Sequence, residues 1–235
     1  MDTESSEEEV NEQIEKNYKF NFWFNVGDGV FFALGMGFIA RTTILPLFVK
    51  NMTDSKFVIS LITAIFMLGS NLPQLFAARF AEGLKRKKKA VLILGLIQRL
   101  PFIILTVLIY LCTPQHMNLL LIVFFICWTL YSLGSGLAVP VWFDLIAKII
   151  PTRRRGKFFG VRSSISKVLG VAAAFGAGII IKQFTFPYNF IMLFGLASGG
   201  VMISYLFLAC VREPINSMTT EANGYRHYFR KLPEI

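Results

Sequence analysis

The stretch FNFWFNVGDGVFFALGMGFIARTTILPLFVK, residues 20–50, decides the fold. As a helix, its roughly 30 residues would extend about 45 Å, which is more than the ~30 Å hydrocarbon core of a bilayer. It contains two charges, Asp28 and Arg41, and the amide of Asn25 lies one turn before the first charge. A charge in hydrocarbon costs at least ~2.5–3.5 kcal/mol, so a membrane helix keeps one only where it faces a partner or water. The stretch therefore predicts a membrane-spanning helix that forms one wall of a polar path.

The composition of the whole chain agrees with a membrane location. Hydrophobic residues make up 54% of the 235 residues and charged residues only 16%, whereas about a quarter of a soluble domain is charged. We expect an integral membrane protein whose first partner is the lipid bilayer. The net charge of +10 does not indicate nucleic-acid binding, because most Lys and Arg residues lie in short segments between apolar runs.

Six apolar runs approach or exceed the ~20 residues that a spanning helix needs. Continuous runs of this length exclude the alternating pattern of a membrane β-barrel. We expect an all-α membrane protein with six transmembrane helices over residues 20–212. An acidic tail, residues 1–19, precedes the bundle and is expected to be disordered or frayed, and a polar tail, residues 213–235, follows it. The runs cover residues 20–49, 57–81, 90–112, 118–150, 158–181 and 190–211.

The distribution of basic residues predicts the orientation. The second and fourth connections and the C-terminal tail hold most of the bases, while the opposite connections hold only Lys50, Lys56 and Lys182. Since bases remain on the cytoplasmic side, both termini are predicted to be cytoplasmic, in a multi-pass protein of the plasma membrane.

Two opposite charges within the runs are predicted to reach a similar depth. Asp28 lies ~12 Å from the inner end of the first helix and Arg99 lies ~14 Å from the inner end of the third. Buried opposite charges usually pair, so we expect these two to meet across the bundle. Two interpretations stay open: a site that couples solute or proton movement to a conformational change, or a structural ion pair between two helices.

Other polar side chains in the runs are weaker candidates for the path. Arg41 either extends outward past Pro46 or lines a cavity. Asn71 and Gln74 flank Pro73, which bends the second helix and leaves a backbone carbonyl free.

The fourth and sixth helices carry aromatic and small residues of interest. Trp128 and Tyr131 either stack on a solute or pack between helices. Gly195 and Gly199 form a small-xxx-small pair, which predicts a close helix contact rather than a site.

Charged residues at the inner ends of the helices predict a cytoplasmic gate. Asp144 is followed by Lys148 and by the arginines of residues 153–155, which suggests a salt bridge that forms when the inner side closes. Glu82 has the same relation to the bases of residues 85–89. The gate candidates are Glu82, Arg86, Asp144 and Arg155.

The sequence lacks the patterns of several enzyme classes. Neither His116 nor His227 lies in an apolar run, so no intramembrane Ser–His pair is expected. There is no Walker-type loop and no Cys/His cluster with metal-ligand spacing. We therefore expect neither an enzyme nor a metal or cofactor site.

Short motifs give a more specific indication. They are Asn25-Val-Gly-Asp-Gly29, Leu72-Pro-Gln-Leu75, Gln98-Arg-Leu-Pro101, Arg155-Gly-Lys-Phe-Phe-Gly160 and Arg212-Glu-Pro214. Together with the succession of helices, they resemble the N-terminal six-helix half of a major facilitator superfamily (MFS) transporter, over roughly residues 20–232.

This resemblance implies a function and a set of partners. Members usually have twelve helices in two halves, each half a 3+3 inverted repeat, and hold the solute between the halves near the midplane. The chain would then be the N-terminal half, or a fragment, of a secondary active transporter that moves a small solute by alternating access, with a proton or ion as the coupling partner. Its first and fourth helices would line the path, and its protein partner would be the second half or another copy. The alternative is a six-helix membrane scaffold or assembly protein that acts as a dimer without transport.

Overall fold

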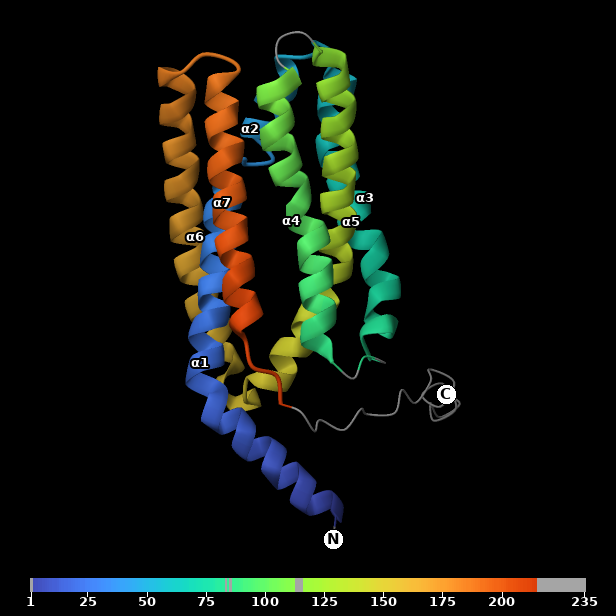
Figure 1. Cartoon of the computed structure of the whole chain (residues 1–235), viewed down its shortest axis with the longest axis vertical. Coiled ribbons are helices and arrows are strands. Elements are labelled where there is room, and N and C mark those ends of the chain that lie inside the picture. Colours follow the sequence, from blue (N-terminus) through green and yellow to red (C-terminus); the bar gives the residue numbers. More distant parts are fainter. Residues whose placement is uncertain (1, 83, 85, 113–115, 215–235) are drawn as a thin grey trace, which may run out of the picture.

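The computed structural model describes the backbone of residues 2–82, 84, 86–112 and 116–214. The side chains of residues 2–8, 76 and 78–82 lie outside the described part, and so do residues 215–235 of the predicted polar tail. The described chain forms seven α-helices and no strand. They are α1 (Asp2–Phe38), α2 (Ile44–Lys50), α3 (Lys56–Glu82), α4 (Lys87–Cys112), α5 (Met117–Ile149), α6 (Thr152–Gln183) and α7 (Tyr188–Cys210) (Figure 1).

Five of these helices are long and apolar enough to cross a membrane, namely α3 to α7. The all-helical membrane fold is therefore confirmed. The first predicted span is not among the five, because Asn21, Asn25 and Asp28 dilute the apolar residues of α1. The count of six spans and the inverted repeat stay predictions.

The first predicted helix is divided in two, so the expectation of one continuous helix over residues 20–49 is wrong. α1 ends at Phe38, and α2 begins at Ile44 after a turn. Pro46 lies in the first turn of α2, where its missing N–H costs no helical hydrogen bond, whereas in a continuous helix it would break one. α2 then buries Leu45 and Phe48 in the core.

The acidic N-terminal segment is helical, in contrast to the expected disordered tail. Residues 2–19 form the first turns of α1. Glu12 and Glu15 precede Lys16 and Lys19 by one turn each, a spacing that stabilises a helix. Acidic residues are also favourable near a helix N-terminus, where the peptide dipoles leave partial positive charge.

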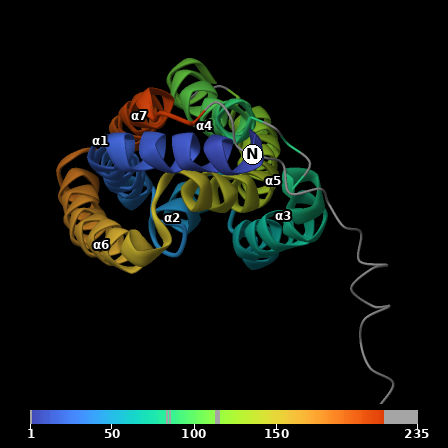
Figure 2. The ribbon, with the colours of Figure 1, turned by 90° about the horizontal axis from the view of Figure 1, so that it is seen from below.

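The helices form two groups that meet at the centre of the bundle. α1 packs against α6 and α7, and α5 packs against α3 and α4, while the contact between α4 and α7 joins the two groups. Viewed along the bundle, α1 and α5 lie in the middle, α4 and α7 on one side, and α3 and α6 on the other with α2 between them (Figure 2). The connections predicted to face the cytoplasm, α3–α4 and α5–α6, lie at the same end of the bundle as the N-terminus (Figure 1).

Two apolar cores follow one another along the bundle. One core, which includes Phe48, Phe124 and Phe194, fills the half near α2. The other, which includes Phe22 and Phe158, fills the half near the N-terminus of α6. Four buried polar residues fall between members of the two cores along α1, α4 and α7, namely Asp28, Gln98, Arg99 and Ser204.

Glycines allow a close contact between α1 and α7. A Cβ atom added to Gly200 would lie 2.9 Å from the Cα atom of Gly35, which is too close for a carbon–carbon contact. The prediction that Gly195 and Gly199 form the close contact is wrong: a Cβ at Gly199 meets nothing within 4 Å, and one at Gly195 meets Thr106 only at 3.9 Å.

This contact gives a test of the fold. Gly200→Ala should lower the unfolding free energy by about 1–3 kcal/mol, because the new methyl group has only backbone to displace. Thermal unfolding in detergent measures the change, and Gly199→Ala is the matched control, expected to leave stability unchanged. Equal effects from the two variants would contradict the packing of α1 on α7.

Candidate functional site

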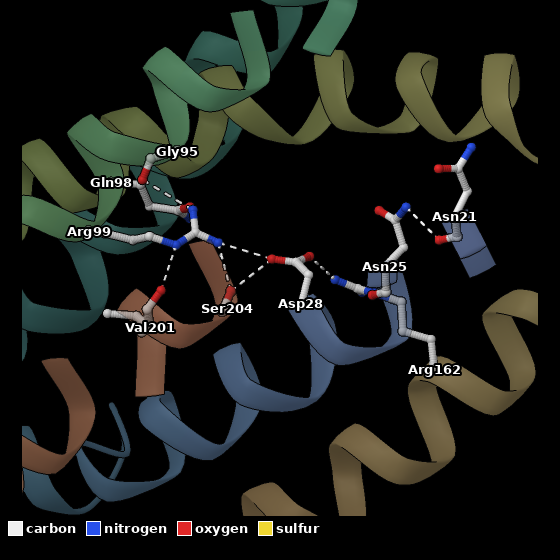
Figure 3. A network of polar contacts seen from close by, with 9 residues as sticks. All are labelled: Asn21, Asn25, Asp28, Gly95, Gln98, Arg99, Arg162, Val201 and Ser204. Atoms are coloured by element: carbon white, nitrogen blue, oxygen red, sulfur yellow. Dashed lines mark hydrogen bonds and ion pairs between the residues drawn. The ribbon is translucent and has the colours of Figure 1, made fainter. Parts of the chain in front are cut away.

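The centre of the bundle contains a buried carboxylate, that of Asp28 on α1. Its Oδ1 atom accepts hydrogen bonds from Ser204 Oγ on α7 at 2.7 Å and from Arg99 Nη2 on α4 at 3.2 Å. Its Oδ2 atom accepts one from Arg162 Nη2 on α6 at 3.1 Å. Figure 3 shows the carboxylate between Arg99 and Ser204 on one side and Arg162 on the other. Four helices therefore contribute to one polar network.

The predicted pairing of Asp28 and Arg99 is confirmed. Arg99 is also held by backbone groups, since its Nε atom donates to the carbonyl of Val201 at 3.0 Å and its Nη1 atom to the carbonyl of Gly95 at 3.1 Å. Its Nη2 atom donates to Ser204 Oγ at 2.8 Å. Every nitrogen of this guanidinium has a partner, which is the condition for keeping a charge in a buried position.

Arg162 completes the network, and the sequence analysis missed it. Its Nε atom donates to the carbonyl of Asn25 at 3.2 Å, and its guanidinium lies over the ring of Trp142 at 4.4 Å. Arg162 falls near the start of the fifth apolar run, and no role was predicted for it. It lies ten residues, roughly 15 Å, along α6 but only four residues, about 6 Å, into the predicted run, so counting along the sequence did not indicate its depth.

Small residues make room for the two guanidinium groups. A Cβ atom at Gly95 would lie 2.8 Å from Arg99 Nη1, and one at Gly29 would lie 2.9 Å from Arg162 Cγ and closer still to its guanidinium. Gly29 directly follows Asp28, so the same turn of α1 provides both the carboxylate and the space beside it.

An open cavity of about 230 Å³ lies beside the network. It is bounded by α1, α4, α5, α6 and α7, and thus lies between the two helix groups. Asp28, Arg99 and Arg162 all reach its wall. The other lining residues are Phe32, Val91, Gly95, Gln98, Ser135, Ala138, Val139, Trp142, Phe143 and Leu208.

The remaining path candidates on α1, on α3 and in the turn before α2 are spread over the bundle. Asn25 is buried next to the network, and its Oδ1 atom has no hydrogen-bond partner among the described residues. Arg41 lies in the turn between α1 and α2 with its guanidinium over the ring of Phe66 at 3.9 Å. Asn71 and Gln74 donate to carbonyls one turn earlier in α3, at 2.7 Å each.

The aromatic candidates on α5 pack inside the apolar core near α2. Trp128 is 1% exposed and donates to the carbonyl of Ile62 at 2.8 Å. Tyr131 is buried beside it, with ring centroids 5.0 Å apart. Neither lines the central cavity, so the structure brings them into helix packing and not into the site.

A second charged cluster lies at the end of the bundle where α4 begins. Asp144 pairs with Lys87 Nζ at 3.1 Å, not with the arginines that follow it in sequence. Glu213 accepts hydrogen bonds from the backbone N–H groups of Lys87 and Lys88, at 3.0 Å each, and pairs with Lys148 at 2.6 Å. Glu213 thus caps α4 and ties the end of α7 to α5, a role that the sequence analysis did not assign.

The other gate candidates do not join this cluster. Arg155 donates to the carbonyls of Ile150 at 3.1 Å and Ala147 at 2.5 Å, so it closes the turn between α5 and α6. Arg86 is exposed and lies directly before α4. Glu82 ends α3, and its side chain lies outside the described residues.

The structure predicts that two acidic residues contribute unequally to the free energy of unfolding. Asp28→Asn should lower the unfolding free energy by about 3–5 kcal/mol, because two guanidinium groups lose their buried counter-charge. Asp144→Asn, whose side chain is 40% exposed, should cost about 1 kcal/mol or less. Thermal unfolding of both variants in detergent measures the difference. If Asp144→Asn proved as damaging as Asp28→Asn, the central network would not be the dominant electrostatic contact.

Comparison with known protein families identifies the superfamily of the chain. The sequence model of the Major Facilitator Superfamily matches residues 29–230, which includes the helices that carry Arg99, Arg162 and Ser204. Comparison with curated proteins and with solved structures finds no match. The match covers most of the chain, and the superfamily is one of membrane transporters and not of enzymes. With its apolar helices, the chain is therefore a multi-pass membrane protein that belongs to the major facilitator superfamily.

Proposed function

We propose that the chain works as the N-terminal six-helix half of a secondary active transporter, which moves a small solute across the plasma membrane by alternating access. The observation that carries this proposal is the network around Asp28. It joins the two helix groups, and it lies beside a cavity between them. Charges at this depth are expensive in a membrane protein, so ionisable residues there are usually functional.

The position of the cavity supports the same proposal. Its wall includes α1 and α5, which correspond to the first and fourth apolar runs, the two that the family resemblance assigns to the solute path. We assign Asn25, Asp28 and Arg99 to the path.

The charged cluster at the start of α4 is the proposed cytoplasmic gate. Asp144 with Lys87, and Glu213 with Lys148, connect α4, α5 and the segment after α7. Salt bridges of this kind can form and break as helices move against one another. In this proposal both termini are cytoplasmic and the bases at this end face the cytoplasm, as the excess of Lys and Arg there favours.

Alternating access can be tested without knowing the solute. Cys112, Cys127 and Cys210 are replaced by serine, and Ser135, which lines the cavity, is replaced by cysteine. In right-side-out and inverted vesicles, a membrane-impermeant thiol reagent should modify Ser135→Cys from both sides, because the cavity opens to each side in turn.

Two further variants serve as controls for this experiment. Asp54→Cys, in the connection between α2 and α3, should react only from outside, and Arg153→Cys, whose native side chain is 72% exposed at the start of α6, only from inside. Reaction of Ser135→Cys from one side alone would contradict alternating access and favour a non-transporting membrane scaffold.

A further inference from the structure

The central network does not carry a balanced charge. One carboxylate, that of Asp28, pairs with two guanidinium groups, those of Arg99 and Arg162. The network therefore has a formal net charge of +1. Among the described residues, Asp28 is the only acid that pairs with either guanidinium. An uncompensated charge inside a membrane protein is costly unless a partner neutralises it.

The two arginines, Arg99 and Arg162, differ in how many of their guanidinium nitrogens donate hydrogen bonds to the protein. Arg99 is 4% exposed, and its Nε, Nη1 and Nη2 atoms all donate to protein groups. Arg162 is 24% exposed and uses Nε and Nη2, while its Nη1 atom has no acceptor among the described residues. Arg162 is therefore the arginine that retains a donor for a molecule in the cavity.

Trp142 offers a second donor next to Arg162. Its indole lies under the Arg162 guanidinium at 4.4 Å, and its Nε1 atom is buried with no acceptor among the described residues. Both residues line the cavity. A buried donor is normally satisfied. The unsatisfied indole N–H of Trp142, beside a guanidinium with an unused N–H and in a network with an excess positive charge, therefore calls for an acceptor that bears negative charge.

We propose that the cavity binds a small oxyanion, a carboxylate or a phosphate, with Arg162 as its charged ligand, Trp142 as a neutral donor and Asp28 as the internal counter-ion that the anion partly replaces. That such an oxyanion is also the transported solute rests on the proposed function. A guanidinium suits both groups, because its parallel N–H bonds match two oxygens of either one. At about 230 Å³, the cavity admits a solute of several heavy atoms, since one water takes up ~30 Å³.

Quenching of Trp142 fluorescence tests the binding directly. The full chain in detergent carries Trp23→Phe, which removes an exposed tryptophan, while Trp128 is 1% exposed and shielded from quenchers. We expect iodide to quench Trp142 more strongly than caesium at equal ionic strength, and succinate or inorganic phosphate to protect Trp142, whereas glucose and choline should not. Protection by only one of the two anions would assign the oxyanion to carboxylates or to phosphates.

Substitutions then separate the anion site from a purely structural network. Arg162→Gln should weaken protection about tenfold or more, because a charge-assisted hydrogen bond is lost, without changing quenching by neutral acrylamide. Asp28→Asn should strengthen protection, since it removes the competing carboxylate. Gly29→Ala displaces Arg162 while keeping every charge, so it should weaken protection as Arg162→Gln does. Gly160→Ala is the matched control: its Cβ meets nothing within 4 Å, so protection should be the same as in wild type.

Three results would overturn the anion site: iodide quenching no stronger than caesium, no protection by either anion, or protection that Arg162→Gln and Gly29→Ala leave unchanged. Uptake of labelled succinate and phosphate into proteoliposomes separates this inference from the proposed function. Binding without uptake would leave the anion site standing and count against transport. Uptake of glucose or choline that is insensitive to Arg162→Gln would support transport and overturn the assignment of an anionic solute.

Discussion

A carboxylate with almost no access to water must have its charge matched by donors close to it, and Asp28 has three. Ser204 and Arg99 bond one oxygen, and Arg162 bonds the other. The donors come from α7, α4 and α6, so the requirement to neutralise one side chain of α1 fixes four helices relative to one another. Coulomb interactions are strong in such a low-dielectric interior, and the rest of the arrangement is built around this contact.

The packing places the network where it can affect movement. An apolar core lies on each side of it along the bundle, and the two helix groups meet at it. Well-packed cores move as units and do not deform continuously. In the proposed transport cycle, a solute that changes the partners of Asp28 alters the contact between the two groups, while Gly35 and Gly200 keep α1 and α7 together as one unit.

The sequence predicted the features that follow from regular helix geometry. Hydropathy identified the helices α3 to α7, and the constant rise per residue brought Asp28 and Arg99 to one depth, where the structure pairs them. Arg162 was not predicted, because it lies only four residues into the predicted fifth run, whereas α6 begins earlier, at Thr152.

Other features depended on contacts that no local pattern contains. The turn before α2 covers only residues 39–43, and hydropathy averaged over the length of a span conceals it, because the residues on both sides are apolar. Gly199 and Gly200 differ by one position, which rotates a side chain by about 100° around a helix, so the sequence pattern selected the wrong glycine. The capping of α4 by Glu213 joins residues far apart in the chain, and only the tertiary structure shows it.

The most direct test of the central claim is a double-mutant cycle between Asp28 and Arg99. Thermal unfolding in detergent is measured for wild type, Asp28→Asn, Arg99→Gln and the double variant. Because each single change leaves the other buried charge without its partner, the account predicts that the double variant is less destabilised than the sum of the two, with a coupling of about 1–3 kcal/mol. Additive effects would mean that the two side chains do not stabilise each other, and would contradict the account.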